Sequence, residues 1–175
     1  MAVLTLCGAC TASARQQSAA DSTPREPPAW TVDPHGIGRV RVGASLATLS
    51  TMLGEPLHAS YAYNETCDYV RPHALPGGVK LMVSRDTVVR VDVDSGTVLT
   101  TKGAGVGTSE ARILTIYGGR VSVQPHPYTG PAGHYLIVPA ADDTMYRLIF
   151  ETDGRAVTRY RAGRRPEVDF KEGCS

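Results

Sequence analysis

The segment best suited to phosphate chemistry is Gly103-Ala104-Gly105-Val106-Gly107-Thr108-Ser109. It stands between an expected strand and an expected helix, where main-chain N–H groups can cradle a phosphate. A dinucleotide fingerprint would need glycine at the sixth position, where Thr108 stands, and a P-loop would need a lysine before the Ser or Thr. We therefore interpret these glycines as turn and helix-start geometry, and we expect no nucleotide and no other cofactor.

Histidines and serines are the next candidates for chemistry. The five histidines are scattered, and none stands in the spacing of a metal or catalytic site. His134, which opens an expected strand, is the strongest single candidate for acid–base work. Ser45 and Ser109 lie outside the G-x-S-x-G motif, and helix capping explains both. The adjacent carboxylates Asp142 and Asp143 should diverge in a turn. We expect no catalytic residues and no metal site.

Tyrosines and C-terminal arginines form the candidate binding surface. The chain has eight Tyr against two Phe and one Trp, and Tyr and Arg are enriched at binding hot spots. The candidate partner-binding residues, from neighbouring expected strands, are Tyr69, Tyr135, Tyr146, Arg159, Tyr160 and Arg161. In the alternative interpretation, the arginines only form ion pairs on a solvated hairpin, with Glu151, Asp153, Glu167 and Asp169.

Cysteine placement points to an oxidising compartment. Cys7 and Cys10 lie near the N-terminus, which leaves Cys67 and Cys174 as an even pair in the rest of the chain. We predict a disulfide between them, closing a loop worth roughly 4–5 kcal/mol by chain entropy. The alternative is two unrelated buried thiols. Neither has the neighbours of a zinc ligand.

The N-terminal residues indicate export. Residues 1–14 are small or apolar and are predicted to be a signal or lipoprotein leader, followed by a disordered, Pro-rich linker over residues 15–35. Gly8-Ala9-Cys10 is similar to a lipobox, which would make Cys10 the lipidated residue. Ala12-Ser13-Ala14 offers a competing cleavage site that would release a soluble protein. A disordered tail on a cytoplasmic protein is the third interpretation.

Charge and hydropathy exclude other classes. With 18 Lys plus Arg against 17 Asp plus Glu, the formal net charge is +1, so nucleic acid is not expected as a partner. No stretch of about 18 apolar residues follows the leader, so no membrane-spanning helix is expected there.

An internal repeat organises the rest of the chain. Residues 42–54 recur 64 positions later as residues 106–118, with the same Val, Gly, Ser, Ala, Thr and final Gly. Ser45 and Ser109 suit helix N-caps, and Gly54 and Gly118 suit left-handed C-caps. The two short helices would be marginal alone, so each must pack on a sheet.

Strands follow each helix. The expected strands are 67–70, 79–83 and 88–93 in the first half and 134–137, 146–150 and 156–160 in the second, with hairpin turns at Asp86-Thr87 and Asp153-Gly154. The fold class is therefore α+β, as two tandem copies of a short helix plus an antiparallel β-meander, the strands forming one helix-backed sheet. Repeat 1 covers residues 36–99 and repeat 2 covers residues 100–175.

The Val-Gly-x-Ser helix start and the Leu53-Gly54-Glu55-Pro56 exit resemble the tandem-repeat superfamily of β-lactamase inhibitor protein and the BamE (SmpA/OmlA-like) lipoproteins. The resemblance covers about 15 residues in each copy. It implies a scaffold that binds other proteins, and so an exported, non-enzymatic periplasmic or outer-membrane lipoprotein with a protein partner in the cell envelope. The alternatives are a secreted enzyme inhibitor and a small exported hydrolase that uses His134.

Overall fold

The computed structural model describes residue 1, residues 30–62 and residues 64–174. Cys10, the predicted leader and most of the predicted linker lie outside the described residues. The described ranges hold two α-helices, α1 (Leu46–Leu53) and α2 (Glu110–Tyr117), and two 3₁₀ turns, η1 (Gly118–Arg120) and η2 (Glu167–Asp169). The strands are β1 (Val32–Asp33), β2 (Gly36–Ile37), β3 (Val40–Arg41), β4 (Cys67–Val70), β5 (Val79–Ser84), β6 (Thr87–Val93), β7 (Ser122–Pro125), β8 (His134–Pro139), β9 (Tyr146–Thr152) and β10 (Val157–Arg164).

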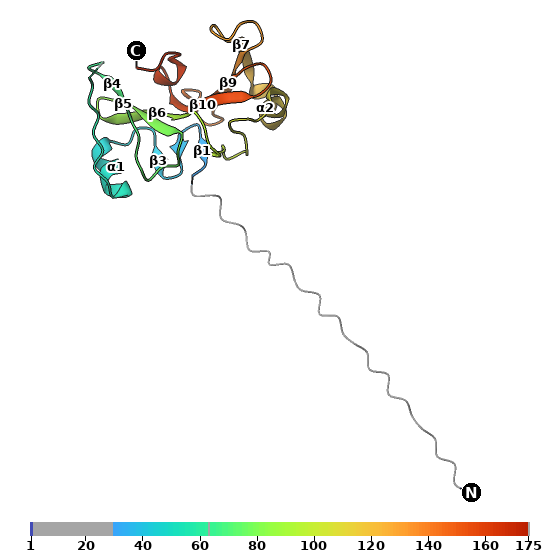
Figure 1. Ribbon diagram of the computed structural model, residues 1–175, viewed down its shortest axis with the longest axis horizontal. Helices are drawn as coiled ribbons and strands as arrows, with labels where there is room; N and C mark the ends of the chain where they lie inside the picture. The colour runs from blue at the N-terminus through green and yellow to red at the C-terminus, as the bar shows by residue number, and fades with distance from the viewer. Residues whose placement is uncertain (2–29, 63, 175) are drawn as a thin grey trace.

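Seven of these strands form one antiparallel sheet in the order β4-β5-β6-β10-β9-β8-β7. The strands of the first half and those of the second half meet where β6 pairs with β10, with Tyr160 opposite Val93. Figure 1 shows α1 and the small β1–β3 sheet below this sheet, and the C-terminal end of the chain above it. The α+β class is confirmed, and the expected strands of both halves do join into one sheet.

Both helices begin where the capping residues predict. The Ser45 hydroxyl accepts the Thr48 N–H at 3.1 Å, and the Ser109 hydroxyl accepts the Arg112 N–H at 3.3 Å. Gly54 ends α1 in the left-handed conformation, with φ 72° and ψ 23°. The C-cap prediction was wrong for the second helix, because Gly118 has φ 59° but ψ −146° and leads directly into η1.

The start of each helix is fixed to a hairpin of the sheet by the same main-chain contact. Gly43 N–H donates to Val88 C=O at 2.8 Å, and Gly107 N–H donates to Val157 C=O at 2.8 Å. Gly105 N–H donates to the Thr108 hydroxyl at 3.0 Å. In the glycine-rich segment, the N–H groups of Gly105 and Gly107 therefore have hydrogen-bond partners within the fold, which agrees with the interpretation of these glycines as turn geometry.

The predicted linker was wrong at its end. Val32, Ile37 and Val40 are fully buried, and they belong to a second, three-stranded sheet, β1-β2-β3. Val32 N–H also donates to Leu99 C=O at 3.0 Å, which fixes this segment to the loop between the two halves. Two-residue strands separated by turns carry no periodicity, so proline and glycine are the main structural signals of the sequence here.

Turn and strand boundaries also differ from the predictions. The β5–β6 turn lies at Arg85-Asp86, one residue earlier than predicted, and both residues have positive φ, 48° and 60°. Such a pair is typical of the type I′ turns that suit two-residue hairpins. β10 extends to Arg164, beyond the expected end at residue 160, and β7 was not predicted. All four residues of β7 are exposed, so no alternation marks it in the sequence.

Candidate functional site

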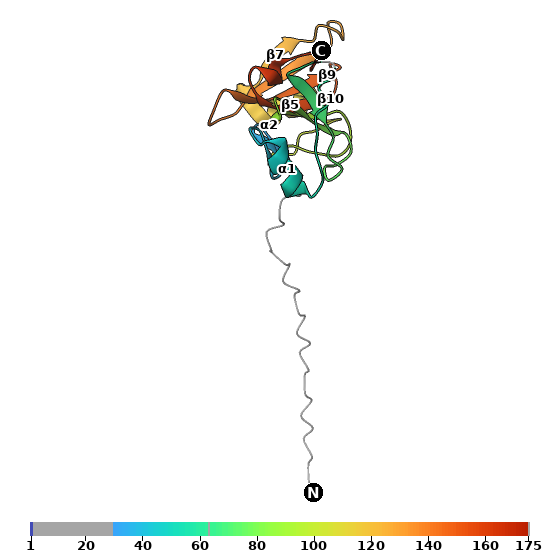
Figure 2. The same ribbon diagram turned by 90° about the vertical axis from the view of Figure 1, so that its left-hand side faces the viewer.

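The candidate site lies on the outer face of the sheet, the face turned away from α1, α2 and the main core. Strand alternation divides the two faces: Val91 and Tyr160 belong to the core, whereas their neighbours Arg90, Asp92 and Arg161 point outward. The C-terminal segment, residues 165–174, lies over this outer face. Figure 2 shows the C-terminus at the opposite side of the sheet from α1.

Covalent and polar contacts hold the C-terminal segment in place. Cys67 of β4 forms the predicted disulfide with Cys174. The Arg90 guanidinium donates to the main-chain oxygen of Phe170 at 2.7 Å, and Arg161 Nε donates to that of Val168 at 2.7 Å. Val168 itself is fully buried. The outer face is therefore part surface and part interior.

Glu151 is the centre of a buried ion-pair network under this segment. Glu151 and Arg161 are each only 3% exposed, and the Arg161 guanidinium donates to the Glu151 carboxylate. Arg159 Nε donates to the same carboxylate at 2.7 Å, and His126 Nε2 lies 3.1 Å from it. Burial raises the pKa of Glu151. The Arg161 charge and the hydrogen bonds from Arg159 and His126 lower this pKa by more, so that it lies below its usual value.

The predicted binding patch was wrong for three of its six residues. Tyr160 is in the core, 1% exposed, and its hydroxyl donates to Val98 C=O at 3.0 Å. Tyr135 and Arg161 are on the outer face, but they are buried under the C-terminal segment. Tyr69 and Tyr146 are half-buried. Only Arg159 keeps half of its side chain in solvent.

Most ion pairs of the alternative interpretation do form, but the hairpin is not fully solvated, because Glu151 and Arg161 are buried. Glu151 pairs with Arg159 and Arg161, Arg165 pairs with Asp169 at 2.8 Å, and Arg164 lies 3.6 Å from Glu167. Asp153 differs from this expectation, because its carboxylate accepts the main-chain N–H groups of Arg155 and Ala156 at 2.9 Å each.

A first hollow on the outer face, named here the Asp94 hollow, has a volume of about 320 Å³ and adjoins another of about 420 Å³. Both are lined by Lys80, Asp94, Tyr128, Glu151 and Arg159. Lys80 Nζ pairs with Asp94 at 2.8 Å. Tyr128 is 64% exposed, and its hydroxyl donates to Glu172. The exposed side chains of Tyr128 and Arg159 thus lie beside the ion pair of Lys80 and Asp94.

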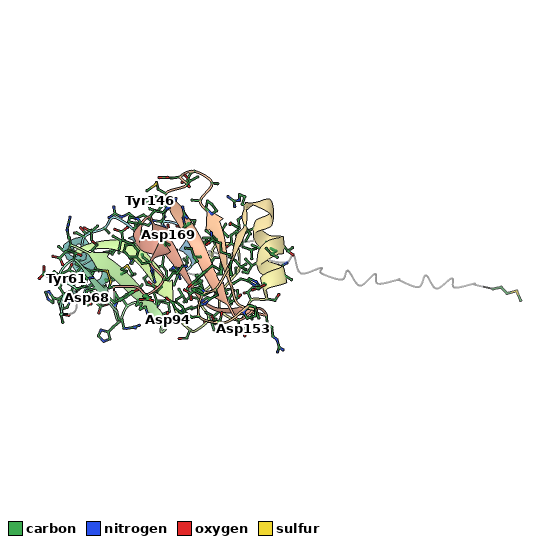
Figure 3. All side chains as sticks on the ribbon, turned by 90° about the horizontal axis from the view of Figure 1, so that it is seen from above. Tyr61, Asp68, Asp94, Tyr146, Asp153 and Asp169 are labelled. Atoms are coloured by element: carbon green, nitrogen blue, oxygen red, sulfur yellow. A yellow bond between two sulfur atoms is a disulfide. The ribbon has the colours of Figure 1, made fainter. Side chains whose placement is uncertain are left out.

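A second hollow, named here the Asp169 hollow, has a volume of about 220 Å³. Its lining is Gln124, Tyr135, Ile137, Arg147, Ile149, Arg161, Arg165, Asp169 and Lys171. Asp169 accepts from Arg147 at 3.3 Å and from Arg165 at 2.8 Å. In Figure 3 the outer face is seen from above, with Tyr146 and Asp169 toward one margin of the sheet and Asp94 toward the other.

A larger hollow, of about 620 Å³, lies beside the disulfide. It adjoins Asn64, the first residue after the gap in the described chain at residue 63. Its remaining lining comes mainly from the C-terminal segment.

His134 lies away from these hollows and has a carboxylate partner that the sequence did not indicate. Its Nδ1 lies 2.8 Å from Glu110 at the start of α2, 24 residues earlier in the chain. The Thr152 hydroxyl donates to the same carboxylate. Thr152 is only 1% exposed, so this hydroxyl cannot contact a substrate. Asp142 and Asp143 diverge as expected: Asp142 pairs with His35 at 3.1 Å, and Asp143 accepts the Met145 N–H.

Comparisons with known proteins give no significant match, whether to a protein-family model, to a curated protein or to a solved structure. Across residues 30–62 and 64–174, no group of three or more His, Cys, Asp or Glu side chains is arranged to hold a metal ion. In the same ranges no helix has the length and apolar character of a membrane span.

Proposed function

We propose that this chain is a non-enzymatic binding module of the cell envelope, anchored through a lipid at Cys10, which engages another envelope protein through the Asp94 hollow. The leader-like residues 1–14 and the lipobox-like Gly8-Ala9-Cys10 support export and anchoring. The disulfide between Cys67 and Cys174 also suits an oxidising compartment.

The observation that carries the binding role is the rigid support under Tyr128 and Arg159. Tyr128 is 64% exposed, while Glu151 fixes Arg159 and a disulfide-linked segment presents Glu172 to the Tyr128 hydroxyl. Tyr and Arg are the residues that most often dominate binding energy. Side chains that are already immobilised lose little entropy on association. This part of the outer face is thus better suited to a protein partner than the solvated edge strand β7.

We also propose that the two halves are copies of one helix-plus-meander unit, as the resemblance to the inhibitor-protein and BamE-like superfamily suggests. The matched contacts at Gly43 and Gly107 support this, as do the bridges that join Ser45 to Thr87 and Ser109 to Ala156. In such a unit the sheet serves as the scaffold, and binding residues come from its surface and loops.

The binding proposal can be tested by site-specific photocrosslinking in cells. A photoreactive residue is placed at Tyr128 on the outer face or, as the matched control, at Thr48, an exposed position of α1. We expect one defined envelope protein to crosslink from position 128 and not from position 48. Purified wild type should then bind that protein, and R159A should weaken the complex while keeping its melting temperature close to that of the wild type. Equal crosslinking from both positions would refute the proposal.

A secreted inhibitor is the alternative that differs mainly at the N-terminus. If Cys10 is lipidated, the wild type should partition with membranes and Cys10→Ala should appear in the soluble fraction. Soluble wild type, cleaved after Ala14, would favour the inhibitor instead.

A small hydrolase remains the third hypothesis because His134 does meet a carboxylate, Glu110. It predicts turnover of simple ester substrates that His134→Gln abolishes without changing stability. Activity that survives this substitution would eliminate the role of His134.

A further inference from the structure

Two buried hydrogen-bond donors at the Asp169 hollow have no partner. Among the described residues, the buried side-chain polar atoms without a hydrogen bond are Tyr135 Oη, Arg147 Nε, Arg164 Nε and Glu167 Oε2. Tyr135 and Arg147 both line this hollow. Tyr135 is 98% buried, being only 2% exposed, so its hydroxyl is not satisfied by bulk solvent. Because buried donors are normally paired, both atoms call for an acceptor placed in the hollow.

The charge of the lining has the same implication. Arg147, Arg161, Arg165 and Lys171 face a single carboxylate, Asp169. Even when Glu151 is assigned to Arg161, the hollow carries more positive than negative charge. The Lys171 ammonium lies over the Tyr135 ring, 5.6 Å from its centre, and so on the same side chain as the hydroxyl without a partner. A small cationic hollow of this kind attracts anions.

The donor set identifies the chemical class of ligand. Guanidinium and ammonium groups only donate hydrogen bonds. Burial and the Glu151 charge raise the pKa of Tyr135, so its hydroxyl also keeps its proton at neutral pH. An ionised oxyanion only accepts, which complements these donors. At about 220 Å³ the hollow suits a single anionic group and not a large ligand. We propose that the Asp169 hollow is a binding site for one oxyanion group, a phosphate or a carboxylate, held by Tyr135 Oη, Arg147 Nε and Lys171 Nζ.

The test follows the Arg147 side chain directly in the full mature chain with its disulfide intact. The Nε–H resonance of Arg147 is assigned by its loss in Arg147→Lys and then monitored by ¹⁵N–¹H NMR during titration. Sodium phosphate is one arm, sodium acetate is the second, and sodium chloride at equal ionic strength is the control. We expect a saturable shift with phosphate or acetate beyond that seen with chloride. Phosphate alone would identify a tetrahedral group, and acetate alone would identify a carboxylate.

A matched pair of variants separates a ligand contact from a structural role. Tyr135→Phe removes only the unpartnered hydroxyl and keeps the ring, so the fold should be retained while anion affinity falls about tenfold. Tyr146→Phe, outside the lining, should leave affinity unchanged. If the Tyr135 variant fails to fold, Lys171→Gln at an exposed position provides the same test. Shifts no larger than those with chloride, or unchanged affinity in the Tyr135 or Lys171 variant, would overturn the proposal. The readout involves no protein partner, and Tyr135 and Arg147 line only the Asp169 hollow, whereas Lys171 lines both hollows.

Discussion

Replacing Glu151 with Gln should strongly destabilise the protein because it leaves Arg161 buried without its carboxylate. Glu151 and Arg161 are each 3% exposed, and outside this pair Arg161 Nε donates to the Val168 main-chain oxygen. Breaking a buried ion pair by removing one partner costs about 3–5 kcal/mol. Arg159 and His126 lose the same acceptor charge, so we expect the upper part of that range.

Urea unfolding followed by circular dichroism measures this loss. With a slope of about 2 kcal/mol per molar urea, a loss of 3–5 kcal/mol lowers the midpoint by about 1.5–2.5 M. The effect should also depend on pH. The folded-state pKa of Glu151 is lowered, so its stabilising contribution is present above the unfolded pKa of about 4.3 and is lost as pH falls through the lower folded value. The difference between wild type and E151Q should therefore be large at neutral pH and shrink in acid.

Two further variants make the argument refutable. Glu65→Gln, at an exposed carboxylate, should change the free energy of unfolding by no more than about 0.5 kcal/mol. E151Q/R161M removes both charges, so it should be more stable than E151Q alone, since no unpaired buried guanidinium remains. If E151Q loses less than about 1 kcal/mol, or if the double variant is no more stable than E151Q, the network does not stabilise the outer face as argued.

Three other changes test the scaffold by the same unfolding assay. The double variant Cys67→Ala/Cys174→Ala should lose up to about 4.8 kcal/mol, the chain-entropy value for a loop of this length, and reduced wild type should match it; an unchanged midpoint under reduction would contradict a bonded pair. Ser45→Ala and Ser109→Ala should each lose about 1 kcal/mol by removal of an N-cap, and a loss at only one site would contradict equivalent capping of the two helices. Gly163→Ala should lose about 1–3 kcal/mol, because its Cβ would lie 2.5 Å from a main-chain oxygen of β6; wild-type stability in this variant would show that the β6–β10 junction can relax.

Local signals in the sequence were sufficient for the helices and most strands. Ser45 and Ser109 mark both helix starts because capping depends only on residues within one turn. Alternation places β5, β6, β8, β9 and β10 to within a few residues. The same rules could not find β1–β3, because two-residue strands have no period and are held by Val32, Ile37 and Val40 in a core that the rest of the chain provides. Cys67 and Cys174 could be paired from the sequence only because no other cysteine follows the leader.

The binding surface was harder to predict because exposure is decided by contacts far apart in the sequence. Alternation correctly separates Tyr160 from Arg159 and Arg161, but it cannot show which face of the sheet is covered. The covering comes from the C-terminal segment, whose main-chain oxygens at Val168 and Phe170 accept from Arg161 and Arg90. Arginine near a surface hairpin is usually solvated, so its burial here requires both Glu151 and those carbonyl groups at once. For the proposed binding role, the consequence is that the candidate contacts are Arg159, which belongs to the predicted patch, and Tyr128, which does not. Arg161 supports the outer face from within, while Tyr128 and Arg159 are the proposed partner contacts at the Asp94 hollow, and Arg147 and Lys171 are proposed anion contacts at the Asp169 hollow.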